Sequence, residues 1–160
     1  MNAEGSEPVV VTLDDQVDEV VDRASWEALA IAVLVEEGFG RNVELNLTFI
    51  GPDEMTELNE SHMGKVGPTD VLSFPLEEDA LNNADPTPPD QPRLLGDVLI
   101  CPRVVHAQAP DRTTEEMALM VVHGVLHILG MDHQQADEAA VMRAAEVRHL
   151  ERWRERASAP

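Results

Sequence analysis

The segment HGVLHILGMDH, residues 123–133, carries three histidines at relative positions zero, four and ten. His123 and His127 are four residues apart, so on a helix they lie on one face, about 6 Å apart along the axis. Two imidazoles at this spacing are able to bind a single metal ion. Gly130 is a residue type that readily adopts the left-handed conformation in which helices end, and such a turn would bring His133 back to the same face. The spacing therefore predicts a three-histidine metal site.

The residues around these histidines favour a buried helix. Residues 117–129 are apolar almost all the way round, and unpaired polar groups in a core are costly. The alternative to a metal site is a pair of hydrogen-bonded core histidines plus an exposed His133. Three neutral nitrogens with an open fourth position are typical of catalytic zinc, so we expect one zinc ion per chain. Cys101 is either a fourth ligand or, as is more usual for a single cysteine, a small buried apolar residue.

Hydrophobic periodicity indicates the elements that position these histidines. Alternating and β-rich runs predict four short strands, at about 9–13, 43–49, 71–76 and 98–101. Helical patterns predict helices at about 18–37, 52–59, 103–108, 113–129 and 136–156, with Thr113 or Thr114 capping the fourth. The sequence therefore predicts an α+β fold: a single small domain with a mixed four-stranded sheet packed with helices, and a metal site on a buried helix.

Length and composition place the chain in a soluble globular class. Its 160 residues fit one domain, with residues 1–8 predicted as a flexible tail and residues 9–157 as the folded unit. The acidic, proline-rich segment 77–92 predicts a mobile surface loop inside that unit. No apolar run reaches the roughly 18–20 residues that span a bilayer, and the N-terminus lacks the features of a signal peptide. With one cysteine, we expect a cytoplasmic protein without membrane association.

The net charge is −20, with ten arginines and the single lysine Lys65 as the basic residues. A field of this sign repels phosphate backbones and argues against non-specific nucleic-acid binding. Five of the arginines lie near the C-terminus among glutamates that include Glu146. Such a mixture is typical of an ion-paired, solvated helix face.

The histidine segment resembles two known metal signatures. The zinc-protease signature HExxHxxGxxH has the same three ligand positions, but its general-base glutamate falls at Gly124, which argues against a peptidase. HGVLHILGMDH is similar, nearly residue for residue, to the H-G-x-L-H-x-x-G-[YF]-D-H signature of the YbeY family, with Met131 in the usual aromatic place. LNESHMGKVGPTDVLSFP (58–75) and LLGDVLICP (94–102) resemble two further stretches of that family, in the same order.

This resemblance implies a single YbeY-like metallohydrolase domain over residues 9–157, with His123, His127 and His133 as zinc ligands. It implies a metal-dependent single-strand endoribonuclease of the bacterial cytoplasm, acting in 16S rRNA 3′-end maturation and in ribosome quality control. The implied partners are ribosomal RNA and small ribosomal subunit proteins or assembly factors. Many members of the family have an arginine before the TDVLSF stretch, thought to contact RNA phosphate. Here that place falls at Met63, with Lys65 as the nearest cation.

Hydrolysis of RNA also requires a group that moves a proton near the metal. Zinc would lower the pKa of a bound water and polarise a phosphoryl oxygen. Asp70, at the start of the predicted VLSFP strand, either transfers the proton or is a turn or capping residue. Asp132 is expected to orient His133 or to form the turn. Lys65 either contacts RNA phosphate or is a solvated loop residue.

The sequence leaves three alternative functions for the chain. The first is a zinc-dependent endoribonuclease. The second is a ribosome-assembly binding factor whose metal is mainly structural, which the charge of −20 and Met63 favour. The third is a metallopeptidase, which Gly124 argues against.

Overall fold

The computed structural model describes residues 7–15, 17, 21–76, 80 and 93–159. Its elements are, in chain order, β1 (Val9–Asp15), α1 (Arg23–Glu36), β2 (Val43–Ile50), α2 (Pro52–Met63), β3 (Val71–Pro75), β4 (Arg93–Ile100), α3 (Pro102–Gln108), α4 (Thr113–Ile128) and α5 (Ala136–Ser158). Apart from residues 7, 8 and 80, the tail predicted at 1–8 and the loop predicted at 77–92 lie outside the described residues. Within the described ranges, no helix is long and apolar enough to cross a membrane.

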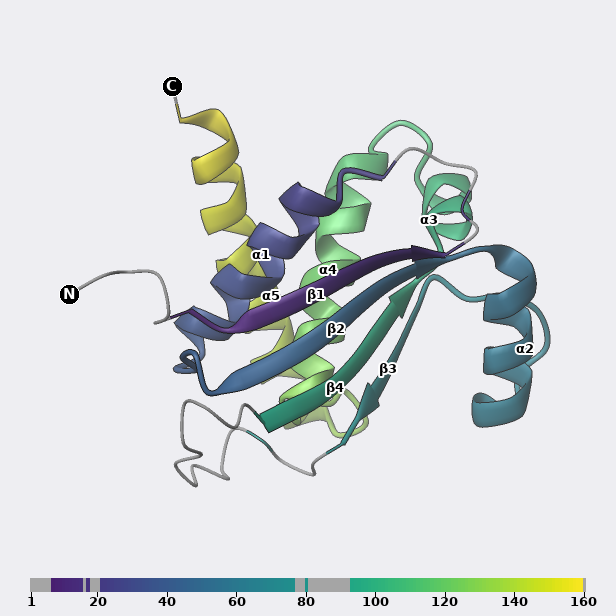
Figure 1. Cartoon of the computed structure of the whole chain (residues 1–160), viewed down its shortest axis with the longest axis horizontal. Helices are drawn as coiled ribbons and strands as arrows, with labels where there is room; N and C mark the ends of the chain where they lie inside the picture. The colour runs from purple at the N-terminus through teal and green to yellow at the C-terminus, as the bar shows by residue number, and fades with distance from the viewer. Residues whose placement is uncertain (1–6, 16, 18–20, 77–79, 81–92, 160) are drawn as a thin grey trace.

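The strands form one mixed sheet in the order β1-β2-β4-β3 (Figure 1). β2 runs parallel to both β1 and β4, whereas β3 pairs with β4 in the antiparallel direction. The parallel pair β1–β2 is connected through α1, as parallel neighbours require a long crossover. The predicted α+β fold, a single domain with a mixed four-stranded sheet, is confirmed.

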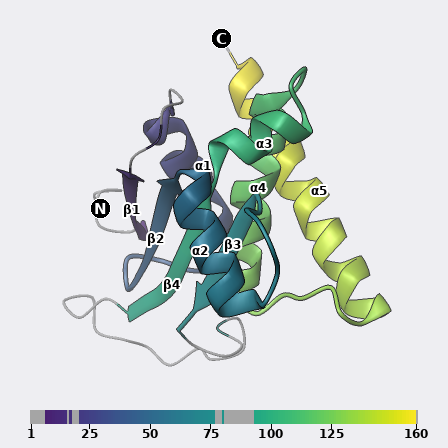
Figure 2. The same ribbon diagram turned by 90° about the vertical axis from the view of Figure 1, so that its right-hand side faces the viewer.

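Helices α1, α4 and α5 lie together on one side of the sheet, behind it in Figure 1 and with α4 and α5 at the right in Figure 2. Alternation along β2 explains this layer, because its buried side chains Val43, Leu45, Leu47 and Phe49 all point to the helices while the residues between them are less buried. Helix α4 is central, since it contacts β3, β4 and the three helices α1, α3 and α5. The main core therefore forms around α4.

Helix α2 packs separately from this layer. Met55 of α2 is fully buried in a small apolar cluster with Ile50, Leu72 and Cys101. Because these partners come from the ends or the start of β2, β3 and β4, α2 is held at one end of the sheet, at the right in Figure 1. This arrangement places the C-terminal end of α2 near β3.

Some local predictions differ from the structure. The residue that caps α4 is Arg112, without a side-chain hydrogen bond, because the Thr113 hydroxyl donates instead to the Ala109 carbonyl at 3.0 Å. Helix α2 continues to Met63 and β4 begins at Arg93, both beyond the predicted bounds. The residues at which short elements begin and end depend on tertiary packing, which hydrophobic periodicity does not show.

The arginines of α5 do form ion pairs, but the predicted pairing with glutamates of the same segment is wrong, because the partners lie elsewhere. Three arginines of α5 pair with glutamates elsewhere: Arg148 with Glu37, directly after α1, at 3.2 Å, Arg152 with Glu36 of α1, and Arg154 with Glu115 of α4 at 3.4 Å. These ion pairs link α5 to the end of α1 and to α4, so the three arginines do not face solvent alone.

Candidate metal centre

The first two histidines of the segment lie on α4, and the helix ends directly after them in a left-handed turn. Gly130 has a φ of +104°. Its N–H donates to the His127 carbonyl and the Met131 N–H donates to the Leu126 carbonyl, both at 3.0 Å. This pair of bonds is a Schellman motif, which satisfies carbonyls left over at a helix end and reverses the chain. The prediction that Gly130 terminates the helix is confirmed.

The reversal brings His133 against the two histidines of α4. The ligand nitrogens of His123, His127 and His133 all lie within 4.8 Å of one another. The ring centroids are 4.5 Å apart for His123 and His127, 5.1 Å for His127 and His133, and 5.8 Å for His123 and His133. The first two rings are partly buried and the third is exposed. Three imidazoles this close together could hold one metal ion.

The electrostatics of the triad fit a cation. Burial lowers the pKa of His127, and the neighbouring His123 and His133 lower it further, while the Asp132 carboxylate acts in the opposite direction. A metal ligand must be a neutral imidazole with a free lone pair. A lowered pKa at the central histidine therefore favours the ligand form at neutral pH. The all-nitrogen donor set is one that suits zinc and other borderline transition metals.

The triad forms one wall of a cavity of about 590 Å³. The opposite side is formed by the edge strand β3 and by the end of α2 with the residues that follow it. The lining residues from these walls are Val71, Leu72, Ser73 and Pro75 of β3, Met63 and Lys65 near α2, and residues 130–134 after α4. The cavity thus lies between a candidate metal ligand set and the edge of the sheet.

Gly124 lies between the two helical histidines and faces the sheet. A Cβ atom at this position would lie 2.5 Å from Cγ1 of Val98 and 3.3 Å from Cγ2 of Val71. The Gly124 carbonyl accepts a hydrogen bond from the Ser73 hydroxyl at 3.0 Å. Helix α4 therefore packs so closely on β3 and β4 that any side chain after the first histidine would force its neighbours to move. The close packing at Gly124 therefore argues, together with the sequence, against the general-base glutamate of the zinc-protease signature.

The other predicted site residues have different positions. Lys65 lines the cavity, as does Met63. Asp70 is not among the described lining residues: its carboxylate accepts hydrogen bonds from the Val71 N–H at 2.8 Å and the Thr69 hydroxyl at 3.3 Å. That is the geometry of a residue at the start of a strand, and its proton-transfer role stays a prediction. Cys101 is fully buried in the apolar cluster around Met55 and is not part of the triad.

Two carboxylates contact the triad. Oδ1 of Asp132 accepts the backbone N–H of His133 at 2.7 Å, which fits its predicted part in the turn. Oε2 of Glu146, on α5, lies 3.0 Å from Nδ1 of His123. The prediction that Glu146 lies on a solvated face is wrong, because its side chain is 17% exposed and contacts His123. The sequence does carry a signal that Glu146 faces inward, because it lies next to Ala145 and one turn after Met142, both of which are buried.

Comparisons with known proteins agree with this geometry. A family model described as Endoribonuclease YbeY matches residues 12–154. The protein named Endoribonuclease YbeY from Salinispora tropica is 39% identical over 140 residues, covering 84% of this chain and 89% of the relative. Its namesake from Beutenbergia cavernae is 42% identical over 125 residues, covering 76% of this chain and 82% of the relative.

A solved structure supports the fold. The solution structure of a Thermotoga maritima protein aligns with a TM-score of 0.61 at 24% sequence identity, covering 92% of this chain and 93% of that one. The family match runs from within β1 to within α5 and includes the histidine triad. The expectation of an enzyme of the endoribonuclease class is confirmed at the level of the family. The chain belongs to the endoribonuclease YbeY family.

Proposed function

We propose that the chain is a zinc-dependent single-strand endoribonuclease that acts in 16S rRNA 3′-end maturation and in ribosome quality control. The observation that carries the proposal is the convergence of His123, His127 and His133 on one cavity, in a chain whose relatives are named endoribonucleases. Its partners would be ribosomal RNA and small-subunit proteins or assembly factors, which places its work in the cytoplasm.

The three histidines would hold one zinc ion. Three protein ligands leave a further coordination position for a reacting group, as in catalytic rather than structural zinc sites. Bound there, zinc would supply Lewis-acid activation of water and of a phosphoryl oxygen. The partly buried setting of His123 and His127 fixes the two rings on a rigid helix, so the ligand set is largely preorganised.

The remaining cavity residues suit a single strand of RNA. Lys65 is the lining residue with a permanent positive charge among those described, and it would contact a phosphate. The pocket is lined by residues of the edge strand β3, and its preference for a single strand is part of the proposal. Asp70 is our sequence-based candidate for proton transfer, and Asp132 is the carboxylate among the described residues that line the cavity. Comparing kcat for Asp70→Asn and Asp132→Asn distinguishes the two candidates.

Two parallel assays test the proposed function. The purified chain is incubated with a single-stranded fragment of small-subunit ribosomal RNA and, separately, with casein, each time after chelation and again after zinc is restored. The proposal predicts RNA cleavage that disappears with chelation and returns with zinc, and no cleavage of casein. Cleavage of casein alone would contradict it and would favour a peptidase despite the packing around Gly124.

A second candidate is a ribosome-assembly binding factor in which the metal is mainly structural. The specific observation in its favour is Met63, which lines the cavity where the family resemblance implies an arginine. The net charge of −20 adds to this, since it opposes RNA binding without a protein partner. RNA that is bound in the presence of zinc but stays uncut in the assay above would favour this function.

A further inference from the structure

Helix α5 brings a carboxylate into direct contact with the metal-binding triad. Oε2 of Glu146 lies 3.0 Å from Nδ1 of His123, although 23 residues separate them in the chain. Both side chains are largely withdrawn from solvent, with exposed fractions of 17% for Glu146 and 22% for His123. A contact this short and this sheltered is a defined hydrogen bond rather than a loose surface pair.

The contact determines which nitrogen of His123 is available to a metal. A carboxylate at neutral pH only accepts hydrogen bonds, so the bond requires a proton on Nδ1. In a neutral imidazole the lone pair then lies on Nε2. The neighbouring rings of His127 and His133 lie 4.5 and 5.8 Å away, measured between centroids. With Nδ1 engaged, Nε2 is the nitrogen of His123 that remains for an ion shared with these rings.

We propose that Glu146 is a positioning residue of the metal centre, holding His123 with Nε2 as its ligand atom and thereby raising the affinity of the triad for zinc. The inference deepens the proposed function and rests on it, because it requires that the triad bind a metal. Hydrogen bonds from a ligating histidine to a carboxylate fix the orientation of the ring and make its free nitrogen a stronger donor.

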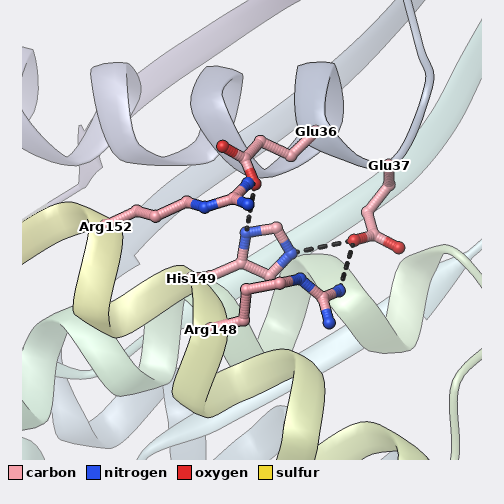
Figure 3. Close-up of polar contacts among 5 residues, drawn as sticks. All are labelled: Glu36, Glu37, Arg148, His149 and Arg152. Carbon is pink, nitrogen blue, oxygen red and sulfur yellow. Dashed lines mark hydrogen bonds and ion pairs between the residues drawn. The ribbon is translucent and has the colours of Figure 1, made fainter.

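The contacts of α5 show why Glu146 is held where it is. One turn along, His149 is buried between Glu36 and Glu37 at the end of α1, with Arg148 and Arg152 paired to the same two carboxylates (Figure 3). On the other side of Glu146, Met142 and Ala145 are buried in the core. The helix is therefore anchored on both sides of Glu146, and its carboxylate does not depend on a flexible surface segment.

The other carboxylate near the triad does not have this role. Oδ1 of Asp132 accepts the backbone N–H of His133 and lies 3.8 Å from the Nδ1 of that ring, beyond hydrogen-bond distance. His133 is also more exposed, at 58% of its side chain. Among the described carboxylates, Glu146 is thus the one with a hydrogen bond to a ring nitrogen of the triad.

The test of the proposal is the zinc affinity of the full chain. The protein is first freed of metal by chelation and dialysis, and its affinity for zinc is then measured by competition with a chromophoric chelator. Glu146→Ala removes the acceptor, and we expect its affinity for zinc to fall by about ten- to a hundredfold. Glu146→Gln keeps a neutral acceptor and should give an intermediate affinity. Glu151→Ala is the matched control, because Glu151 lies on the exposed side of the same helix. Its affinity should equal that of the unmodified chain.

A second readout separates positioning from general stability. Nitrogen-15 NMR of the metal-free protein reports the tautomer of His123, which should carry its proton on Nδ1 in the unmodified chain and lose this preference in Glu146→Ala. Melting temperatures in chelator show whether each variant folds. If the alanine variant does not fold, the glutamine variant decides the matter, since the proposal requires its affinity to lie below that of the unmodified chain.

The outcomes separate this inference from the proposed function. Equal zinc affinity in the unmodified chain and in a folded Glu146 variant would overturn the role of Glu146 and leave the metal centre standing. Absence of zinc binding by the unmodified chain would overturn both. A graded loss from glutamate through glutamine to alanine, with the Glu151 control unchanged, is the result that the proposal predicts.

Discussion

Nε2 of His149 on α5 lies 2.9 Å from Oε2 of Glu37 at the end of α1, joining two residues that are 112 positions apart in the chain (Figure 3). The imidazole is almost fully buried, at 3% exposure. Burial lowers the pKa of His149 below its ordinary value of 6.5, and the positive charges of Arg148 and Arg156 lower it further, against the opposing effect of Glu37. His149 is therefore neutral at neutral pH and donates to Glu37.

The lowered pKa of His149 predicts a loss of stability in mild acid. As the pH falls, the unfolded chain takes up this proton first, so acid favours unfolding. The contribution of neutral His149 to the free energy of unfolding is complete above about pH 6.5. It is lost as the pH falls through the pKa of His149 in the folded state. His149→Gln keeps a donor for Glu37 without titrating. Urea unfolding in chelator should show a smaller loss of stability between pH 7 and pH 5 for this variant.

The charged groups around His149 are held constant in that comparison. They are Glu36 and Glu37 at the end of α1 and Arg148, Arg152 and Arg156 of α5. An equal loss of stability in the two proteins would show that other groups, and not His149, cause the acid sensitivity.

The close approach of α4 to the sheet predicts a large effect of a small substitution. Gly124→Ala places a methyl group 2.5 Å from Cγ1 of Val98. Neither helix nor strand moves freely at this position, so we expect a loss of about 1–3 kcal/mol in the free energy of unfolding. The pair Gly124→Ala and Val98→Ala tests the cause. Removing the Val98 methyls should make the alanine at position 124 less costly, and simple additivity of the two losses would contradict the steric account.

Metal binding predicts that the stability cost of losing His127 depends on zinc. An ion bound only by the folded state adds about 2.7 kcal/mol of stability at a hundredfold excess over its Kd. His127→Ala weakens that Kd, so the variant should lose most of this contribution when zinc is present. Melting curves with zinc and with chelator measure both situations. If His127→Ala lowers the stability equally with zinc and with chelator, His127 acts as a core residue only.

The position of Met63 predicts a gain of RNA binding from a single added charge. Met63 lines the cavity and is 46% exposed. Met63→Arg should tighten binding of single-stranded RNA by roughly ten- to a hundredfold, the effect of about 1.5–3 kcal/mol for a charge-assisted contact. The slope of log affinity against log salt should steepen by about 0.7.

Val66→Arg is the control for this effect. Val66 is 93% exposed and is absent from the described lining of the cavity, so the variant changes the net charge equally without adding a contact there. If both arginine variants bind RNA equally well, general charge and not the cavity is responsible.

The histidine spacing was sufficient to predict the triad because all three ligands belong to one local unit, a helix and the turn that ends it. Gly130 is a local signal of the same kind. Glu146 could not be predicted this way, since its contact with His123 depends on how α5 packs across the core. The same reason explains Asp70: its place before β3 was predicted, but the direction of its side chain depends on local hydrogen bonds with Thr69 and Val71.

The strands and helices were predicted in the right order because periodicity reflects which face of each element is buried. The pairing order of the sheet and the partners of the α5 arginines are long-range properties. Arg148, for example, has glutamates nearby on its own helix, yet it pairs with Glu37 at the end of α1. Only the packed structure determines that choice.

The central claim is that the three histidines hold the metal on which RNA cleavage depends. His133 is the most direct position for a test, because its side chain is 58% exposed and its loss should cost the fold little. The measurement is cleavage of single-stranded ribosomal RNA by chelated protein as zinc is titrated back, for the unmodified chain, for His133→Ala and for His106→Ala, an exposed histidine on α3 as control.

We predict that activity of the unmodified chain and of His106→Ala returns as zinc approaches one ion per chain, and that His133→Ala stays at least about a hundredfold less active at the same zinc concentration. Cleavage by His133→Ala at the rate of the unmodified chain, or full activity of the unmodified chain in chelator, would contradict the claim.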